Sequence, residues 1–179
     1  MKLIGGLRRI HIHVLLAAVG LVLARPTLAG NLAGTLLVLV GSGIRLWAAG
    51  ALEKGGGLCT DGPYRWVRHP LYLGSFVAAF GFCVMMDVIW GWVIVLPLFV
   101  ALYVAQVMLE ERRLRQEFGE AHADYSRRVP LMLPRPPRAG PPGRAWQLAR
   151  VLVNREHYHV ALTCVLVVMF YLRHWWPAV

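Results

Sequence analysis

Residues 70–109 read PLYLGSFVAAFGFCVMMDVIWGWVIVLPLFVALYVAQVML, and Asp87 is the only charged side chain in this run of 40 residues. A helix needs about 20 consecutive apolar residues to cross a bilayer, so the run has the length of two spans. We expect one span to follow Pro70 and reach about Met86, and the other to cover about Val88–Leu109. Asp87 then marks a tight turn, and the sequence predicts a helical hairpin within a membrane.

Three further apolar blocks predict the remaining spans, at about Ile10–Ala24, Leu32–Leu52 and Tyr158–Trp176. The first block follows two arginines, as the apolar part of a secretory signal does. It ends at Arg25 and Pro26, however, where a signal would carry a small-residue cleavage pattern. We therefore interpret it as a retained transmembrane helix.

The composition excludes a soluble domain of this size. The chain of 179 residues is 58% hydrophobic and 16% charged, with a mean hydropathy of +0.54, whereas soluble domains are about half apolar. The surplus apolar surface must face lipid. The predicted fold class is all-α, a polytopic membrane helix bundle of about five transmembrane helices.

The positions of the basic residues set the expected orientation, because short cytoplasmic loops carry an excess of Lys and Arg. A cytoplasmic N-terminus puts three groups on that side: the basic residues before the first span, those of residues 53–70, and the ten arginines from Arg112 to Arg155. The net charge of +10 then reflects topology and attraction to anionic lipid headgroups. We expect membrane lipids and no nucleic acid as partners, and an integral protein of a bacterial inner (cytoplasmic) membrane.

Two polar segments interrupt the spans on the expected cytoplasmic side. Residues 53–70, EKGGGLCTDGPYRWVRHP, contain a triple glycine and an Asp-Gly-Pro turn, which disfavour regular structure and permit close backbone approach to a ligand. Residues 110–128, EERRLRQEFGEAHADYSRR, predict a charged helix that continues straight out of the fourth span along the headgroup region. The expected parts are two N-terminal spans (1–52), a core (53–133), a proline-rich linker (134–144) and a C-terminal helix with the fifth span (145–179).

Aromatic, cationic and acidic side chains gather near the expected cytoplasmic face, as a cofactor with an aromatic base, an ammonium and a carboxylate would require. Polar groups at membrane depth are candidates for function, although basic anchors and an interfacial aromatic belt would have the same composition. Arg45 is interpreted as a snorkelling residue, with Glu110 as an alternative inward partner. The cysteines are too far apart for a redox or zinc motif, so we predict no disulfide and no metal site. The candidates are Tyr64, Trp66 and Tyr72 as aromatic faces, Arg65, Arg68 and His69 as donors, and Glu110 and Glu111 as acids.

Two motifs at this spacing are more specific: GPYRWVRHPLYLG at residues 62–74 and EERRLRQEFGEAHADYSRRVP at residues 110–130. Together they resemble the integral membrane methyltransferases that include isoprenylcysteine carboxyl methyltransferases and phospholipid N-methyltransferases. The resemblance covers about residues 53–133. It implies an S-adenosylmethionine-dependent methyltransferase acting at the cytoplasmic face on a lipophilic, membrane-embedded acceptor, either a prenylcysteine-like carboxylate or a phospholipid amine. The matching positions are Gly62, Tyr64, Arg68, His69, Pro70, Tyr72, Gly74, Glu110, Glu111, Leu114, Phe118, Gly119, Tyr125, Arg128, Val129 and Pro130.

The resemblance also implies residue roles. Glu110 suits the ammonium of S-adenosylmethionine, a tyrosine ring suits the adenine or the sulfonium, and His69 suits the carboxylate as a donor. Methyl transfer from an activated carbon needs mainly alignment and exclusion of water, so no side chain is assigned to the chemical step. Arg68 and Gln106 are expected on the substrate side. The residues expected to line the cofactor pocket are Leu58, Tyr64, His69, Pro70, Tyr72 and Glu110.

Two positions depart from the family pattern. Gln106 stands where prenylcysteine enzymes carry an arginine associated with substrate, which weakens the case for a terminal carboxylate acceptor, and Gly56 stands where the family has a histidine. Two alternatives remain: an NADPH-dependent sterol reductase, which shares the RHPLYLG segment but not EERRL, and a non-catalytic membrane protein that keeps the fold. Binding of the methyl donor separates these alternatives from a methyltransferase.

Overall fold

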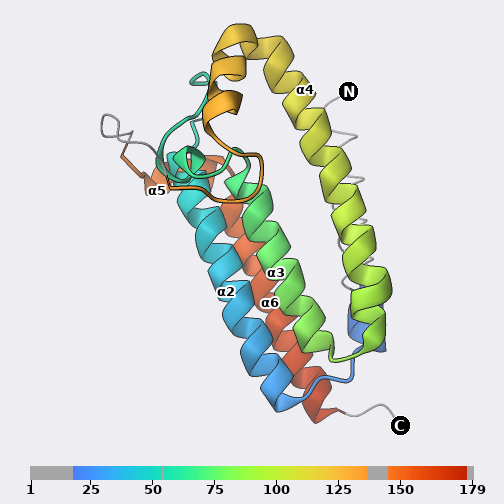
Figure 1. Ribbon diagram of the computed structural model, residues 1–179. Helices are drawn as coiled ribbons and strands as arrows, with labels where there is room; N and C mark the ends of the chain where they lie inside the picture. The colour runs from blue at the N-terminus through green and yellow to red at the C-terminus, as the bar shows by residue number, and fades with distance from the viewer. Residues whose placement is uncertain (1–17, 54, 137–144, 177–179) are drawn as a thin grey trace.

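The computed structural model describes residues 18–53, 55–136 and 145–176, and all regular structure in those residues is helical (Figure 1). Residues 18–23 form the end of the first expected span, and the part of that span before residue 18 lies outside the described residues. The elements are α2 (Leu28–Ala51), the 3₁₀ turn η1 (Gly62–Arg65), α3 (Pro70–Met86), the π-helical η2 (Gly91–Val95), α4 (Leu96–Arg128), α5 (Leu148–Val153) and α6 (Glu156–Trp175).

Three of the described helical segments are long and apolar enough to cross a membrane: Leu28–Ala51, Gly91–Arg128 and Glu156–Trp175. The apolar α3 is shorter, with 17 residues. The second, third and last expected spans coincide with α2, α3 and α6 to within four residues at each end. The total of about five spans and the cytoplasmic N-terminus stay predictions.

A polar contact ties the start of α2 to the end of α3. The Thr27 side chain accepts a hydrogen bond from the Gly30 N–H at 3.1 Å and so caps α2, which begins four residues before the expected Leu32. The Thr27 hydroxyl also donates to Asp87 Oδ2 at 2.7 Å. Asp87 ends α3 in the left-handed backbone conformation, with a φ of 49°. The tight turn expected at Asp87 is confirmed.

Glycines bring α2 and α3 into backbone contact at two levels. A Cβ atom added at Gly41 would lie 2.5 Å from the carbonyl oxygen of Gly74, and one added at Gly34 would lie 2.5 Å from that of Gly81. Helices in membranes associate through such small residues, because close backbone approach replaces the missing hydrophobic driving force. These two helices run side by side over most of their length in Figure 1.

Aromatic rings join α3 to the helical segment that follows the hairpin turn. Edge-to-face packing of this kind is the preferred geometry of aromatic pairs. The ring contacts extend from the Asp87 turn to the N-terminal end of α3. They therefore hold α4 beside the first turn of α3. The pairs are Phe80–Trp92, Phe76–Phe99, Phe76–Tyr103 and Tyr72–Tyr103, with ring centroids 4.9–5.8 Å apart.

Helix α6 packs against both α2 and α3 (Figure 1) and supplies the partner of Arg45. The Arg45 guanidinium donates to Glu156 Oε1 at 2.5 Å and to Oε2 at 3.0 Å, and it also donates to the Leu71 carbonyl and the Ser75 hydroxyl. The interpretation of Arg45 as a snorkelling residue is wrong, as is Glu110 as its partner. The side chains of Arg45 and Glu156 are only 15% and 6% exposed. A charge at this depth needs a countercharge, and α6 provides it.

Helix α4 continues from the apolar segment into the charged one, as expected, but it does not stay straight. Gly119 has a φ of 48° and a ψ of −120°, which breaks the helical path. The chain turns back there, and the last part of α4 returns over the 62–69 turn (Figure 1). The Tyr125 hydroxyl donates to the Tyr64 carbonyl at 2.7 Å, and the Arg68 N–H donates to the Pro130 carbonyl at 2.9 Å. The returning segment therefore holds this turn in place.

Two further details differ from the expected organisation. The 53–70 loop is not wholly irregular, because Pro63 starts the short 3₁₀ turn η1 within it. The C-terminal part is divided into α5 and α6, since Arg155 has a left-handed backbone with a φ of 61°. Most of the expected proline-rich linker, residues 137–144, lies outside the described residues.

Candidate active site

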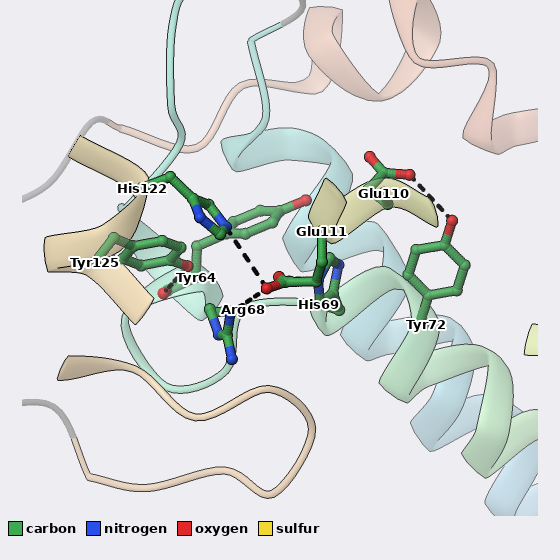
Figure 2. A network of polar contacts seen from close by, with 8 residues as sticks. All are labelled: Tyr64, Arg68, His69, Tyr72, Glu110, Glu111, His122 and Tyr125. Atoms are coloured by element: carbon green, nitrogen blue, oxygen red, sulfur yellow. Dashed lines mark hydrogen bonds and ion pairs between the residues drawn. The ribbon is translucent and has the colours of Figure 1, made fainter. Parts of the chain in front are cut away.

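The two sequence motifs meet at one end of the bundle (Figure 2). The 62–69 turn and the first turn of α3 face the middle of α4 and its returning part. Pro70 occupies the first position of α3, where its missing N–H costs nothing, and it is buried. His69 is therefore fixed immediately before the helix, and Tyr72 lies in its first turn. The sequence of this motif places its polar side chains toward α4.

A tyrosine and a carboxylate form the contact between α3 and α4. The Tyr72 hydroxyl donates to Glu110 Oε2 at 3.1 Å. The Tyr72 ring also packs edge-on against His69 and Tyr103, with both centroid distances at 5.7 Å. A carboxylate beside aromatic rings is suited to a cationic ligand such as an ammonium group. Tyr72 and Glu110, which were both expected to line the cofactor pocket, lie in contact in the structure.

Glu111 is the centre of a second and more buried cluster. Its Oε2 accepts a hydrogen bond from Arg68 Nη1, and its Oε1 lies 2.7 Å from His69 Nε2. His122 from the returning part of α4 adds a third basic side chain, with its Nε2 3.6 Å from Glu111 Oε2. The Glu111 side chain is 12% exposed, so these contacts are screened little by solvent. Glu111 thus connects the 62–69 turn with both parts of α4.

The protonation of His69 follows from its surroundings. Burial lowers the pKa of His69, while its hydrogen bond to Glu111 and the charges of Glu111 and Glu110 oppose that shift. We therefore treat the ring as neutral near neutral pH. An ionised carboxylate only accepts hydrogen bonds, so the proton is on Nε2 and points to Glu111. The other ring nitrogen, Nδ1, then carries a lone pair. The expected donation from His69 to a cofactor carboxylate would need the protonated ring.

Tyr64 is fixed by packing and by its backbone. It is 7% exposed and packs against Ala48 and Ala51 of α2. Burial raises the pKa of Tyr64 well above its ordinary value. The phenol therefore keeps its proton at all physiological pH values.

Sequence reasoning missed His122. On an unbroken helix it would lie 11 residues, or about 16 Å, beyond Glu111. The reversal at Gly119 brings the two together. A glycine within a charged helical pattern is the one signal in the sequence that the helix breaks there.

Two expected residues lie outside the contact network of Figure 2. Leu58 is half-buried in the glycine-rich loop, and Gln106 is half-buried on α4, one turn before Glu110. Arg68, which is expected on the substrate side, binds Glu111.

An apolar pocket of about 230 Å³ lies between α3, α4 and the segment that follows α4. Phe76 is one helical turn from Tyr72, and Val107 is one turn from Glu110, so the pocket lies about one helical turn from the Tyr72–Glu110 contact. Its lining residues are Phe76, Val104, Val107, Met108, Leu131 and Met132.

Comparison with known proteins agrees with this arrangement. The family model described as phospholipid methyltransferase matches residues 29–121, which is just over half of the chain and includes the 62–74 motif, α3, Glu110 and Glu111. The chain belongs to the phospholipid methyltransferase family. The expected relationship to membrane methyltransferases is confirmed, and with the three long apolar helices it indicates an integral membrane protein.

Curated relatives match shorter parts of the chain. The protein-S-isoprenylcysteine O-methyltransferase of Mus musculus is 40% identical over 78 residues, covering 43% of this chain and 27% of that protein. The methanethiol S-methyltransferase of Mycobacterium tuberculosis is 39% identical over 75 residues, covering 42% of this chain and 30% of that protein. No solved structure is a significant match.

A third relative bears a different kind of name. The nickel-cobalt-cadmium resistance protein NccN of Alcaligenes xylosoxydans xylosoxydans is 36% identical over 104 residues, covering 57% of this chain and 47% of that protein. The chain thus spans less than half the length of these curated relatives. Among residues 18–53, 55–136 and 145–176, no group of three or more His, Cys, Asp or Glu side chains is arranged to hold a metal ion.

Proposed function

We propose that the protein transfers a methyl group from S-adenosylmethionine to a lipophilic acceptor held in the membrane. The observation that carries this proposal is the position of the Tyr72–Glu110 contact, next to the polar Glu111 cluster and about one helical turn from the apolar pocket of about 230 Å³. A polar cofactor and an apolar acceptor can meet only at such a boundary.

The side chains on the polar side fit the cofactor. Glu110 offers a carboxylate for its ammonium, and Tyr72 and Tyr64 offer aromatic faces for the adenine or the sulfonium. The Nε atom of Arg68 is buried and makes no hydrogen bond to any described residue, so it is a donor available to a carboxylate. Bound S-adenosylmethionine would supply a methyl group on a sulfonium, which needs no further activation. The protein then has to align the two partners and exclude water.

The apolar pocket supports an acceptor that arrives from the bilayer. Every lining side chain is apolar, and four of the six lie on α3 and α4, between which an alkyl chain could enter from lipid. Names of relatives offer three acceptor chemistries: a prenylcysteine carboxylate, a phospholipid amine and a thiol. We propose that the acceptor carries one of these groups on an apolar chain.

Calorimetric titration of the detergent-solubilised protein with S-adenosylmethionine, and in parallel with NADPH, tests the proposal. A charge-assisted hydrogen bond contributes about 1.5–3 kcal/mol, so Glu110→Gln should weaken S-adenosylmethionine binding about 10- to 100-fold. Glu117→Gln removes an exposed carboxylate two turns further along α4 and should leave binding unchanged. Binding of NADPH alone would refute the proposal in favour of a reductase. Binding of neither would leave a non-catalytic protein.

We also propose that the N-terminus and the site face the cytoplasm of a bacterial cell, with the protein in the inner membrane. The distribution of basic residues supports this orientation. Reporter fusions to each terminus, one active only in the cytoplasm and one only outside it, would test it. An N-terminal fusion active only outside would overturn the orientation.

A further inference from the structure

His122 is buried without a hydrogen-bond partner. It is 1% exposed, and neither of its ring nitrogens makes a hydrogen bond to any described residue. An unsatisfied polar group in this position is costly, and an apolar ring of the same size would fill the space without that cost. Its Nε2 faces Glu111 Oε2 at 3.6 Å, slightly beyond hydrogen-bond distance (Figure 2). Packing alone therefore does not account for a histidine here.

The same carboxylate supports His69 from its other oxygen. The Nε2–H of neutral His69 donates to Glu111 Oε1, with 2.7 Å between nitrogen and oxygen, and the lone pair is left on Nδ1. Nδ1 makes no hydrogen bond to any described residue. An imidazole backed by a carboxylate in this way is the arrangement of a general base. The ring also packs against Tyr72, which holds Glu110, so this base stands beside the proposed cofactor residues.

We propose that His69, Glu111 and His122 form a proton relay, and that the methyl acceptor is a nucleophile that carries a proton, a thiol or an amine. This inference rests on the proposed methyltransferase function and narrows its substrate class. As the acceptor's sulfur or nitrogen bonds to the methyl carbon, the carbon–sulfonium bond breaks and leaves a neutral thioether. The acceptor's proton must then leave. A carboxylate acceptor has no such proton at neutral pH and would need no relay.

The geometry gives each proton a place. The acceptor's proton goes to His69 Nδ1, and the Nε2 proton of His69 goes to Glu111 Oε1. The protonated carboxyl group of Glu111 then turns about its Cγ–Cδ bond and passes that same proton to His122 Nε2, which lies 3.6 Å from the carboxyl group. At the end Glu111 is again a carboxylate that binds Arg68, and His122 is an imidazolium that now has the partner it lacked. The charged and titratable groups around the relay are Arg68, Glu110, Tyr64, Tyr72 and Tyr125 (Figure 2).

A first test uses the protein without any acceptor. Nitrogen-15 NMR of histidine-labelled protein in detergent reports which ring nitrogen of each histidine carries the proton. We expect His69 in the Nε2–H form near neutral pH, and we expect Glu111→Gln to reduce that preference. A His69 ring protonated on Nδ1 would overturn the relay, because no lone pair would face the acceptor.

A second test uses three probes with the same ten-carbon chain: decanethiol, decylamine and decanoate. Formation of S-adenosylhomocysteine is followed across a pH series for the unaltered protein and for His122→Gln, His122→Phe and the control His157→Gln, which changes an exposed histidine of α6. We expect methylation of the thiol or the amine. We expect both His122 variants to lower its kcat about tenfold and to change its pH profile, with KM unchanged.

The outcomes separate the relay from the underlying function. Methylation of decanoate alone, or of no probe although S-adenosylmethionine binds, would overturn the relay and leave the cofactor proposal standing. A folded His122→Phe protein with the kcat and pH profile of His157→Gln would also overturn it. Failure to bind S-adenosylmethionine at all would remove both proposals.

Discussion

Glu156→Gln tests whether α6 stabilises the bundle through charge. This change keeps the size of the side chain and removes the negative charge that faces Arg45. Glu156 is 5% exposed, so water has little access to this position and cannot solvate the Arg45 guanidinium in place of the carboxylate. The variant leaves a buried guanidinium without its countercharge.

The expected loss can be worked out from the contacts of Arg45. Two of its four hydrogen bonds go to Glu156 and two go to Leu71 and Ser75, which the variant does not touch. Breaking a buried ion pair from one side costs about 3–5 kcal/mol. Because Arg45 is 15% exposed and keeps two partners, we expect the lower end, about 3 kcal/mol. For a chain of this length that corresponds to a fall in Tm of about 6–12 °C.

Thermal unfolding in detergent, followed by circular dichroism, measures this change. Glu120→Gln removes an exposed carboxylate of α4 and serves as the matched control. The double variant Arg45→Met/Glu156→Met replaces the pair by apolar side chains of similar length and should recover at least half of the loss. A Tm for Glu156→Gln equal to that of the control would refute the reasoning. So would a double variant less stable than the single one.

Three further predictions concern backbone contact and protonation. Gly41→Ala should lower the Tm strongly, because its Cβ would lie 2.5 Å from a backbone oxygen of α3, whereas Gly43→Ala, where nothing lies within 4 Å, should not. Gly119→Ala should cost about 1–3 kcal/mol, because its backbone conformation is nearly restricted to glycine; a Tm equal to that of the unaltered protein would contradict the role of the reversal. Since burial lowers the pKa of His69, its contribution to stability is complete above the ordinary histidine pKa of about 6.5 and declines as the pH falls toward its lower value in the folded protein. Thermal unfolding between about pH 8 and about pH 5 should show this decline, and His69→Gln should reduce it.

The helices could be predicted because lipid imposes a simple length rule. The apolar runs ending at Ala51, Met86 and Trp175 are visible in the sequence, and so is the turn at Asp87. Their pairing could not be predicted in the same way. A buried arginine needs an acidic partner, but the sequence does not show which acidic residue this is. The partner of Arg45 is Glu156, which lies 111 positions further along the chain.

The part of the site that lies within the two sequence motifs could be predicted from the sequence. His69, Pro70 and Tyr72 stand together because Pro70 starts a helix, and Tyr72 meets Glu110 because the hairpin brings the first turn of α3 beside the middle of α4. His122 could not be found in this way. Its approach to Glu111 depends on a single positive φ angle at Gly119. The glycine signals a break in the helix, but the sequence does not give the direction in which the chain continues.

Helix α4 carries Glu110 and Glu111 directly after an apolar segment that is long enough to cross a membrane. A helix whose apolar length does not match the bilayer tilts to compensate. Tilting of α4 against the glycine-packed α2 and α3 would move the Glu110 carboxylate relative to Tyr72, from which it is separated by only 3.1 Å. The acyl-chain length of the host membrane would thus change the distance between Tyr72 and Glu110. The rate of the proposed methyl transfer would then depend on the thickness of the bilayer.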